Sequence, residues 1–242
     1  MPFMHRYIGN PLLTFIGNVF FRTSIGDFHC GLRGFTKAAF QKMNLNSKGM
    51  EFASEIVVKS SMLGLKITEV PTNVFASGRS RKPHLRTFPD GWRHLRFLLL
   101  YSPKWLFLIP GILLLLIGAL GLLLFLDKST INWVILNLCL VLISFQFIIF
   151  FALTKIFAIN HGLIPKSKNH SKIFKLFTLE RGLLSGVLMT IVGGYFFISG
   201  VPKNAPTELE LKLILTSSLA MVLGIEIILF SFFFSILGLT DE

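Results

Sequence analysis

The stretch Trp105–Leu126, WLFLIPGILLLLIGALGLLLFL, decides the architecture of this 242-residue chain. It is a continuous apolar run, and a helix rising about 1.5 Å per residue needs about 20 such residues to cross a hydrocarbon layer about 30 Å thick. Three further runs of this kind follow, at Ile131–Leu153, Gly182–Val201 and Leu213–Leu239. The rest of the chain is too small to cover four apolar helices, so the sequence predicts four membrane spans.

The composition points the same way. The chain is 52% hydrophobic and 15% charged and contains 26 phenylalanines, whereas soluble domains carry about 25% charged residues. The two cysteines, Cys30 and Cys139, are too few for a disulfide framework or a cysteine-based zinc site. We therefore exclude disordered, collagen-like and small disulfide-rich secreted proteins.

The basic residues predict an orientation in the membrane. Residues 1–104 hold 15 of the 24 lysines and arginines, and the loop 155–181 is also strongly basic. The positive-inside rule then places both segments, and both termini, in the cytoplasm, as in a multi-pass protein of the plasma membrane. The surplus charge suits anionic lipid head groups, and we expect no nucleic-acid partner because no aromatic–basic recognition module is present.

Ahead of the spans, the sequence predicts helices at Thr36–Met43 and Met50–Leu63 and a strand at Lys66–Phe75, interrupted by Pro71. A further helix begins at Asn10-Pro11. Its predicted apolar stripe consists of Leu12, Ile16, Val19 and Phe20. Because an α/β domain of this size should show several strands, the segment resembles only part of one.

The segment just before the first span has the pattern of an amphipathic helix. Asp90 can cap it, and Trp92, Leu95 and Leu99 fall on one face. We expect this helix, and a second at Ser171–Thr178, to lie at the level of the head groups; the alternative is packing on a soluble core. His94 is interpreted as a surface residue.

Four spaced motifs carry a family resemblance. They are GNPLLTFIGNVFF at 9–21, IGDFHCGLRGFTKAAF at 25–40, GMEFASEIVVKSSMLGLKITEVPTNVF at 49–75 and GRSRKPHLRTFPDGWRHLRFLLLYSPKW at 78–105. In this order, and followed by four spans, they resemble the family 2 glycosyltransferases that load sugars onto polyprenyl phosphates, the dolichyl- and undecaprenyl-phosphate mannosyl- and glucosyltransferases.

The resemblance implies a fold and a division of the chain. Residues 1–87 correspond to the acceptor side of a GT-A catalytic domain, an α/β remnant; 88–104 to the interfacial helix; and 105–242 to a four-helix transmembrane bundle. Family members begin with a nucleotide-binding half that holds a DxD motif, and no DxD triplet occurs here. We therefore expect an N-terminally truncated member that is inactive alone.

Family chemistry transfers a sugar, with inversion, from a nucleotide sugar to the phosphate of a polyprenyl lipid. The phosphate is already ionised at neutral pH, so holding two anionic substrates together is the harder task. The complete enzyme is expected to use Mg or Mn. We predict no metal site and no cofactor within this chain, since the metal ligands would lie in the absent half. A homo-oligomer is left open.

The resemblance assigns roles to three residues of the first segment. Asp27 would orient the acceptor or act as a base, the alternative being a turn or capping residue. Arg33 would hold a phosphate, because its planar fork grips two oxygens; the alternative is a salt bridge to Asp27 or Glu55. Glu55 would face the active site as a second catalytic carboxylate, the alternative being a solvated or paired one.

A basic loop and one buried acid complete the candidates. Arg79, Ser80, Arg81 and Lys82 lie just before the interfacial helix, where a lipid phosphate would leave the membrane, so we predict that they bind it; general attraction to head groups is the alternative. Glu226 lies within the fourth span, where a carboxylate costs about 2.5–3.5 kcal/mol. Its candidate partners are Gln146 and Asn137, and its role could be packing or head-group handling.

Two functions remain in view at this point. The chain could be a membrane glycosyltransferase or its acceptor-side fragment. It could instead be a non-enzymatic membrane subunit that binds or translocates a lipid and retains a catalytic remnant. The intact acceptor-side motifs favour the first function, whereas the missing donor half favours the second.

Overall fold

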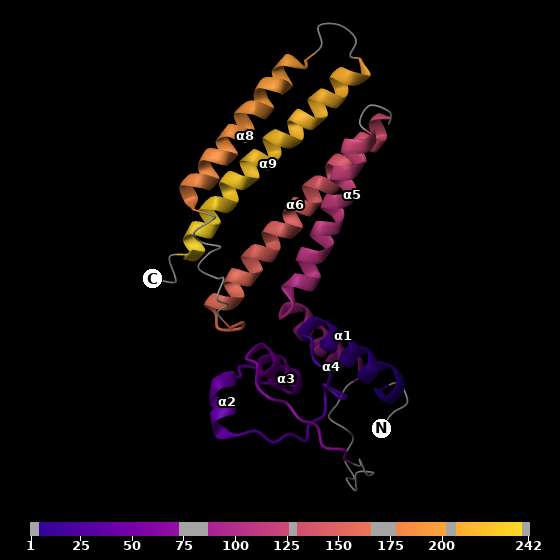
Figure 1. The fold of residues 1–242 in the computed structure, drawn as a ribbon, viewed down its shortest axis with the longest axis vertical. Coiled ribbons are helices and arrows are strands. Elements are labelled where there is room, and N and C mark those ends of the chain that lie inside the picture. Colours follow the sequence, from indigo (N-terminus) through magenta and orange to yellow (C-terminus); the bar gives the residue numbers. More distant parts are fainter. Residues whose placement is uncertain (1–4, 73–86, 126–129, 166–177, 202–206, 239–242) are drawn as a thin grey trace. The chain divides into compact units, whose positions relative to one another are not determined.

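A computed structural model describes residues 5–72, 87–125, 130–165, 178–201 and 207–238 (Figure 1). Every regular element in these ranges is a helix. The elements are short π-helical turns η1 (His5–Gly9) and η2 (Lys104–Leu108) and α-helices α1 (Asn10–Phe21), α2 (Lys37–Met43), α3 (Phe52–Met62), α4 (Thr87–Leu100), α5 (Ile109–Phe125), α6 (Ile131–Asn160), α8 (Leu179–Ser199) and α9 (Glu208–Gly238). The chain divides into two compact units between Ser102 and Pro103, with residues 163–165 grouped with the first.

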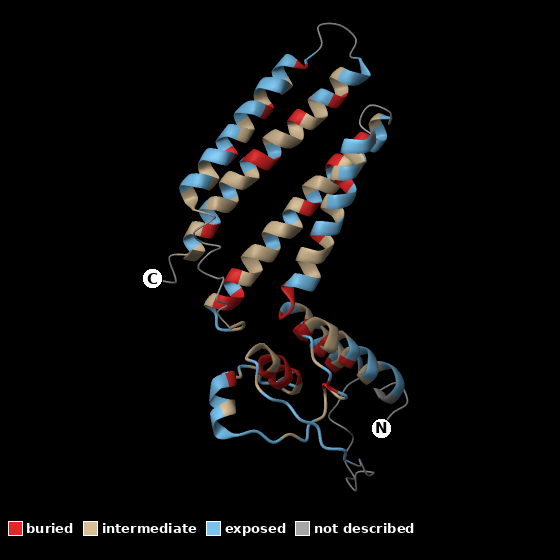
Figure 2. Cartoon of the chain, viewed as in Figure 1, coloured by how far each residue is buried: buried red, intermediate tan, exposed pale blue. Residues whose placement is uncertain are grey.

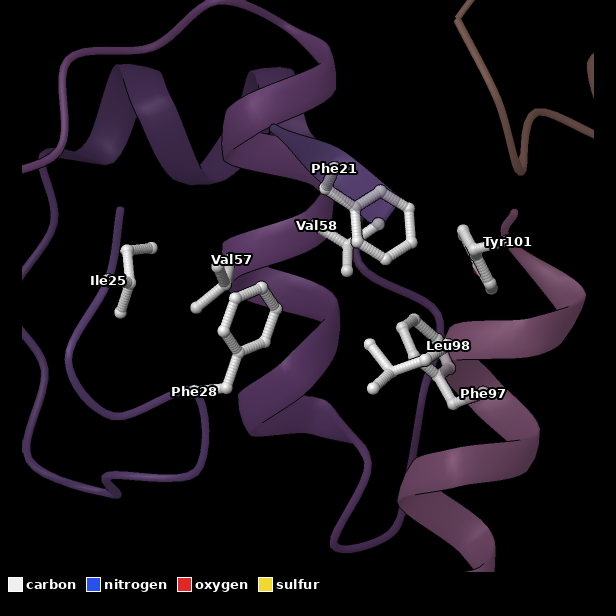
Figure 3. Packing of buried hydrophobic residues seen from close by; sticks show 8 residues of the cluster. All are labelled: Phe21, Ile25, Phe28, Val57, Val58, Phe97, Leu98 and Tyr101. Carbon is white, nitrogen blue, oxygen red and sulfur yellow. The ribbon is translucent and has the colours of Figure 1, made fainter. Parts of the chain in front are cut away.

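The first unit is built around α3, whose residues 54–60 are all buried (Figure 2). Helices α1, α2 and α4 each pack against it. Its apolar core joins residues from α1, α3, α4 and the loop after α1, as Figure 3 shows. The members are Phe21, Ile25, Phe28, Val57, Val58, Phe97, Leu98 and Tyr101. Phe28 and Val58 are completely buried, so the loop that carries Phe28 is part of the core.

The local signals for α2 and α3 are confirmed. Thr36 caps α2 by accepting a hydrogen bond from the Ala39 N–H at 3.2 Å, which satisfies one of the free amides of a helix start. The predicted stripe of α1 is confirmed in part, because Ile16 and Phe20 pack against the core, whereas Leu12 is 54% exposed. The buried residues of α1 are Thr14, Gly17 and Phe21.

The predicted strand at Lys66–Phe75 is wrong where the structure describes it. Residues 66–72 form no ladder with any described segment, and 73–75 lie outside the described residues. A strand is stable only when a neighbour accepts its backbone hydrogen bonds. The described part of the first unit is therefore helical, and the α/β remnant is not shown.

Helix α4 buries a different face from the one that carries Trp92. Its buried residues are Asp90, His94, Phe97 and Leu98, which recur at helical spacing. Trp92 is 59% exposed. The helix thus packs on the core of its unit and leaves the Trp92 face outward, and its position at the head groups stays a prediction. The interpretation of His94 as a surface residue is wrong.

The second unit contains the four predicted spans. They are Lys104–Leu124, Ile131–Asn160, Leu179–Ser199 and Glu208–Gly238. Each is long and apolar enough to cross a membrane, and most of its surface is uncovered by protein (Figure 2). Side chains such as Leu123, Leu184 and Ile198 are more than 70% exposed, as expected when lipid is the solvent.

Small residues let the spans approach closely. A Cβ atom on Gly186 of α8 would lie 2.7 Å from the Gly224 carbonyl oxygen of α9, and one on Gly193 would lie 2.9 Å from the Met221 backbone nitrogen. On α5, a Cβ at Gly118 would lie 2.9 Å from the Asn137 carbonyl oxygen of α6. The α8–α9 and α5–α6 hairpins are therefore held by backbone proximity, as in other membrane helix pairs.

Hydrogen bonds from two residues of α6 link the two hairpins within this unit. The Gln146 side chain on α6 donates a hydrogen bond to the Glu226 carboxylate on α9, and Asn160 on α6 donates to the Leu237 carbonyl at 2.9 Å. Gln146 is thus confirmed as the partner of Glu226. Asn137 instead donates to the Trp133 carbonyl of its own helix at 2.7 Å.

Candidate functional site

The loop Gly26–Phe35, which carries the Asp27 and Arg33 motif, starts from a fixed end of α1. Arg22 ends α1 in the left-handed conformation, with φ of 55°. Asn18 then ties the following residues back to the helix. Its amide donates to the Ile25 carbonyl at 2.8 Å, and its carbonyl oxygen accepts from the Ile25 N–H at 3.0 Å and from the Thr23 hydroxyl at 2.6 Å. Asn18 therefore sets the direction in which the loop leaves α1.

Phe28 anchors the loop in the core. Its ring lies against Gly17, where an added Cβ would approach the ring to 2.8 Å. Its backbone N–H donates to the Thr14 hydroxyl at 3.2 Å. Thr14 and Gly17 both lie on the buried face of α1, so this helix fixes the position of Phe28, the residue next to Asp27.

Asp27 forms a local turn with one of its carboxylate oxygens. Oδ1 accepts the His29 N–H at 2.8 Å, which is the Asx-turn arrangement. No described residue donates a hydrogen bond to its second oxygen or forms an ion pair with it. Asp27 therefore acts as the turn residue that the alternative described, and its second carboxylate oxygen remains able to accept a hydrogen bond.

Arg33 holds the loop by donating to three backbone carbonyls. Nε donates to Cys30, Nη2 to Phe28 and Nη1 to Ala53 at the start of α3, each at 2.7 Å. A guanidinium has five N–H groups, so one remains on each terminal nitrogen. Neither Asp27 nor Glu55 forms a salt bridge with it, among the residues that the structure describes.

The electrostatic setting of Arg33 leaves its positive charge without a direct counterion from the described part of the chain. Burial lowers the pKa of its guanidinium, and Cys30, Asp27 and Glu69 partly offset this effect. Glu69 is engaged elsewhere: both its oxygens accept the Gly26 N–H at 3.0 Å. An arginine remains charged in any protein setting, so an anion that reached Arg33 would find a half-buried cation with two N–H groups to donate.

Glu55 is completely buried and fully occupied. Oε1 accepts from the Asn46 N–H at 2.9 Å and from Lys59 at 2.9 Å, and Oε2 accepts from the Ser47 N–H at 2.8 Å. Lys59 in turn donates to the Asn44 carbonyl at 2.5 Å. Burial alone would raise the pKa of Glu55, but Lys59 and the two amides outweigh it and lower the pKa. These contacts favour the paired, structural alternative.

A cluster of three polar side chains lies beside the loop. The Ser54 hydroxyl on α3 is 2.9 Å from Nδ1 of His94 on α4 and 3.4 Å from Nδ1 of His29. The two imidazole rings meet edge to face, with centroids 4.3 Å apart. Burial, His94 and Arg33 lower the pKa of His29 to about 3. Burial also lowers the pKa of His94, against the opposing effect of Glu51 and Asp90.

The structure thus brings Asp27 and Arg33 into one ordered loop and places Glu55 in a separate buried pair on α3. Arg79, Ser80, Arg81 and Lys82 lie outside the described residues, as do residues 171–177 of the second predicted interfacial helix. Within the described ranges, no three His, Cys, Asp or Glu side chains lie together in an arrangement that could hold a metal ion. The role predicted for each of these residues stays a prediction.

Several residues that shape the site were missed from the sequence. Asn18, Glu69 and Ser54 give no local pattern that separates them from ordinary polar positions. Lys59 could have been found, since it lies four residues after Glu55, the spacing at which opposite charges meet on a helix. His29 and His94 are 65 positions apart, and nothing in the sequence pairs them.

The second unit carries the observation that identifies its relatives. Residues 152–238, from the end of α6 through α9, match the family described as "Glycosyltransferase family 2 C-terminal transmembrane region". This region is therefore similar to the membrane region of family 2 glycosyltransferases. The resemblance to family 2 glycosyltransferases is thereby confirmed, whereas the polyprenyl-phosphate group within that family stays a prediction.

A curated relative supports the same relationship. The chain is 44% identical over 124 residues to the low-salt glycan biosynthesis hexosyltransferase Agl6 of Haloferax volcanii. The matched segment is 51% of this chain but 30% of that relative, so the chain matches less than a third of its length. No solved structure matches.

Proposed function

We propose that this chain is the acceptor-side and membrane part of a family 2 glycosyltransferase that transfers a sugar from a nucleotide sugar to a polyprenyl phosphate. The observation that carries the proposal is the combination, in one chain, of an ordered Asp27–Arg33 loop and the matched membrane region at 152–238. The inverting mechanism, the lipid acceptor and the nucleotide donor are parts of this proposal.

Arg33 supplies the phosphate contact in this proposal. Its three carbonyl bonds fix the guanidinium plane, and one N–H on each terminal nitrogen remains to donate. Two parallel N–H groups match two oxygens of a phosphate, the geometry in which arginine binds anions best. Binding an anion there also compensates a half-buried positive charge, which favours association.

Asp27 acts beside it in orienting the acceptor. One oxygen is used in the turn with His29, so the second can accept a hydrogen bond from a substrate hydroxyl or restrain the incoming phosphate. A polyprenyl phosphate is ionised at neutral pH and needs no strong base. The work assigned to this loop is therefore positioning, which can supply a large share of a rate enhancement.

The remaining predicted residues take secondary places in this scheme. The basic loop Arg79–Lys82 is proposed to draw the lipid phosphate toward Arg33, together with anionic head groups. Glu55, buried and paired with Lys59, is proposed to hold the 44–47 turn in place. The expected Mg or Mn ion and the nucleotide would be held by a donor-binding half, so no step is derived through them here.

The second candidate function is lipid binding or translocation without catalysis. The observation that favours it is the length comparison, since the chain matches 30% of the hexosyltransferase Agl6. Both functions require the polyprenyl phosphate site, and they differ only in whether a sugar is transferred.

The test uses the full chain in lipid nanodiscs, with undecaprenyl phosphate and undecaprenol as a matched pair of ligands. We expect binding of the phosphate and not of the alcohol. Arg33→Gln should weaken binding, and Lys42→Ala, which removes an exposed charge on α2, should not. Equal binding of the phosphate and the alcohol would contradict the proposed site.

A second arm separates the two functions. The chain is co-expressed with the segment encoded directly upstream, and formation of sugar-linked lipid from a labelled nucleotide sugar is measured. Transfer that is lost with Asp27→Asn supports the enzyme, because asparagine keeps the turn and removes only the charge. Lipid binding without transfer supports the non-enzymatic subunit.

A further inference from the structure

We propose that His29, Ser54 and His94 form a positioning cluster that fastens the Asp27–Arg33 loop to α3 and α4. The three side chains come from three separate segments: the loop, α3 and α4. The geometry of the cluster stands by itself. Its consequence for the acceptor rests on the proposed function of Asp27 and Arg33.

The cluster is a hydrogen-bonding unit centred on Ser54, which is completely buried. The Nε2 atom of His29 is also buried and has no hydrogen-bond partner among the described residues. A hydroxyl has one proton and two lone pairs. It can therefore donate to Nδ1 of His94 at 2.9 Å and accept from the Nδ1–H of His29 at 3.4 Å. His94 must be neutral for this arrangement, because a doubly protonated His94 ring would offer its Nδ1–H where the Ser54 proton points, whereas His29 donates its Nδ1–H in either protonation state.

The burial of Ser54 also argues against a role for this residue as a nucleophile. A Ser–His pair at 2.9 Å resembles an activated nucleophile, but the hydroxyl has no exposed surface. No substrate can reach it without opening the packing of α3 and α4. The pair is therefore suited to holding segments together and not to covalent chemistry.

The link from the cluster to the proposed site runs through His29. Its backbone N–H donates to Oδ1 of Asp27 at 2.8 Å, while its ring is held by Ser54 and packs on His94. Arg33 fastens the other end of the same loop to the start of α3 through Ala53. The carboxylate of Asp27 is thus placed by α3 and α4 together.

The loop contains its own reporter in Cys30, a partly buried free cysteine directly after His29. Because the thiol is only partly buried, its rate of alkylation reports how accessible the loop is, and this rate rises when the loop is held less firmly. The experiment uses the full chain in nanodiscs with Cys139→Ala, so that Cys30 is the single thiol. A water-soluble maleimide is the probe.

Four variants are compared in this background. Ser54→Ala removes one oxygen from the centre of the cluster, and His94→Phe keeps the ring but removes both nitrogens. His94→Asn retains a polar atom at the position of Nδ1 and serves as the conservative rescue. His161→Phe, at the end of α6, is the matched control for loss of a histidine elsewhere.

We expect Ser54→Ala and His94→Phe to speed Cys30 alkylation about fivefold, the effect of losing one net hydrogen bond. His94→Asn and His161→Phe should stay near the parent rate. Parent-like rates in both Ser54→Ala and His94→Phe would overturn the proposal. A His94→Asn rate equal to that of His94→Phe would also overturn it, because packing alone would then explain the effect.

The alkylation result does not depend on any ligand, so it can fail separately from the proposed function. Binding of undecaprenyl phosphate is measured on the same samples. Faster alkylation with weakened phosphate binding supports positioning of the acceptor site. Faster alkylation with unchanged phosphate binding would overturn the link from the cluster to the acceptor.

Discussion

The two units of this chain reach order by different means. In the first, a few buried polar side chains bind backbone groups of distant segments, as Asn18, Arg33 and Glu55 do. In the second, long apolar helices make their own backbone hydrogen bonds and approach one another at glycines. The comparison teaches that individual polar side chains fix the loops of the first unit, whereas close packing of helix backbones at glycines holds the second unit together.

The largest effect is expected where the first unit depends on a buried ion pair. Glu55→Gln leaves Lys59 buried without a carboxylate, and breaking such a pair costs about 3–5 kcal/mol. Hydrogen exchange should show loss of protection over residues 44–60.

The matched control is Glu208→Gln, which removes a pair of the same i,i+4 spacing with Lys212 at 3.0 Å. Lys212 is 9% exposed but Glu208 is 61% exposed, so water reaches one partner of this pair, and its loss should cost less than that of a pair with both partners buried. Equal losses in both variants would erase the contrast between the units.

The next effect tests backbone proximity in the second unit. Gly186→Ala places a methyl group against the Gly224 carbonyl oxygen, and overpacking of this kind costs about 1–3 kcal/mol. Gly194→Ala, on the same helix, meets nothing within 4 Å. Thermal denaturation in detergent should lower the Tm for Gly186→Ala only. A Tm unchanged by both substitutions would show that α8 and α9 do not rely on this approach.

The stability of the first unit should depend on pH through its neutral histidines. The folded pKa of His29, about 3, lies below the ordinary value of 6.5, and that of His94 is lowered as well. The unfolded chain then binds more protons than the folded one as the pH falls below about 6.5. Stability is complete above that pH and declines by at most about 1.4 kcal/mol per pH unit for each histidine.

This pH dependence is measured by proteolysis of the first unit between pH 7.5 and 5. The double variant His29→Asn with His94→Asn should flatten the profile while the second unit stays unchanged. A wild-type profile as steep as that of the double variant would show that the histidines do not contribute.

The smallest effect is expected at the polar pair between the hairpins. Gln146→Leu removes the hydrogen bond to Glu226, and such bonds within membranes average about 0.6 kcal/mol. A cysteine pair placed across α6 and α9 should cross-link slightly less efficiently in this variant. Asn137→Leu is the control: it removes a bond within α6 and changes the contact with Gly121 of α5, but it keeps the Gln146–Glu226 bond and should leave cross-linking of α6 to α9 unaffected.

The sequence predicts the second unit better than the first, for a physical reason. Hydropathy determines whether a helix can lie in lipid, so the four spans follow from composition alone, with ends shifted by a few residues. In α4 both faces carry apolar side chains, and hydropathy cannot choose between Trp92 and Phe97 as the buried residue. The tertiary partner of the helix makes that choice.

The candidate site shows the same limit. Asp27 and Arg33 were found as members of one motif, and both lie in one ordered loop. The bonds that shape the loop come from Asn18, Thr14 and Ser54, whose side chains are common in any helix. The strand expected at Lys66–Phe75 fails in its described part because a β-pattern in the sequence does not supply a neighbour to pair with.

The contact between Gly17 and Phe28 determines the smallest segment in which the Asp27–Arg33 loop can keep its conformation. The aromatic ring needs a helix that lacks a methyl group at one position and offers a hydroxyl three residues earlier, at Thr14. Transplanting only the Asp27–Arg33 segment into another protein would therefore lose its conformation. A transplant that includes α1 would also carry the contacts of Thr14 and Gly17 that hold Phe28 in place.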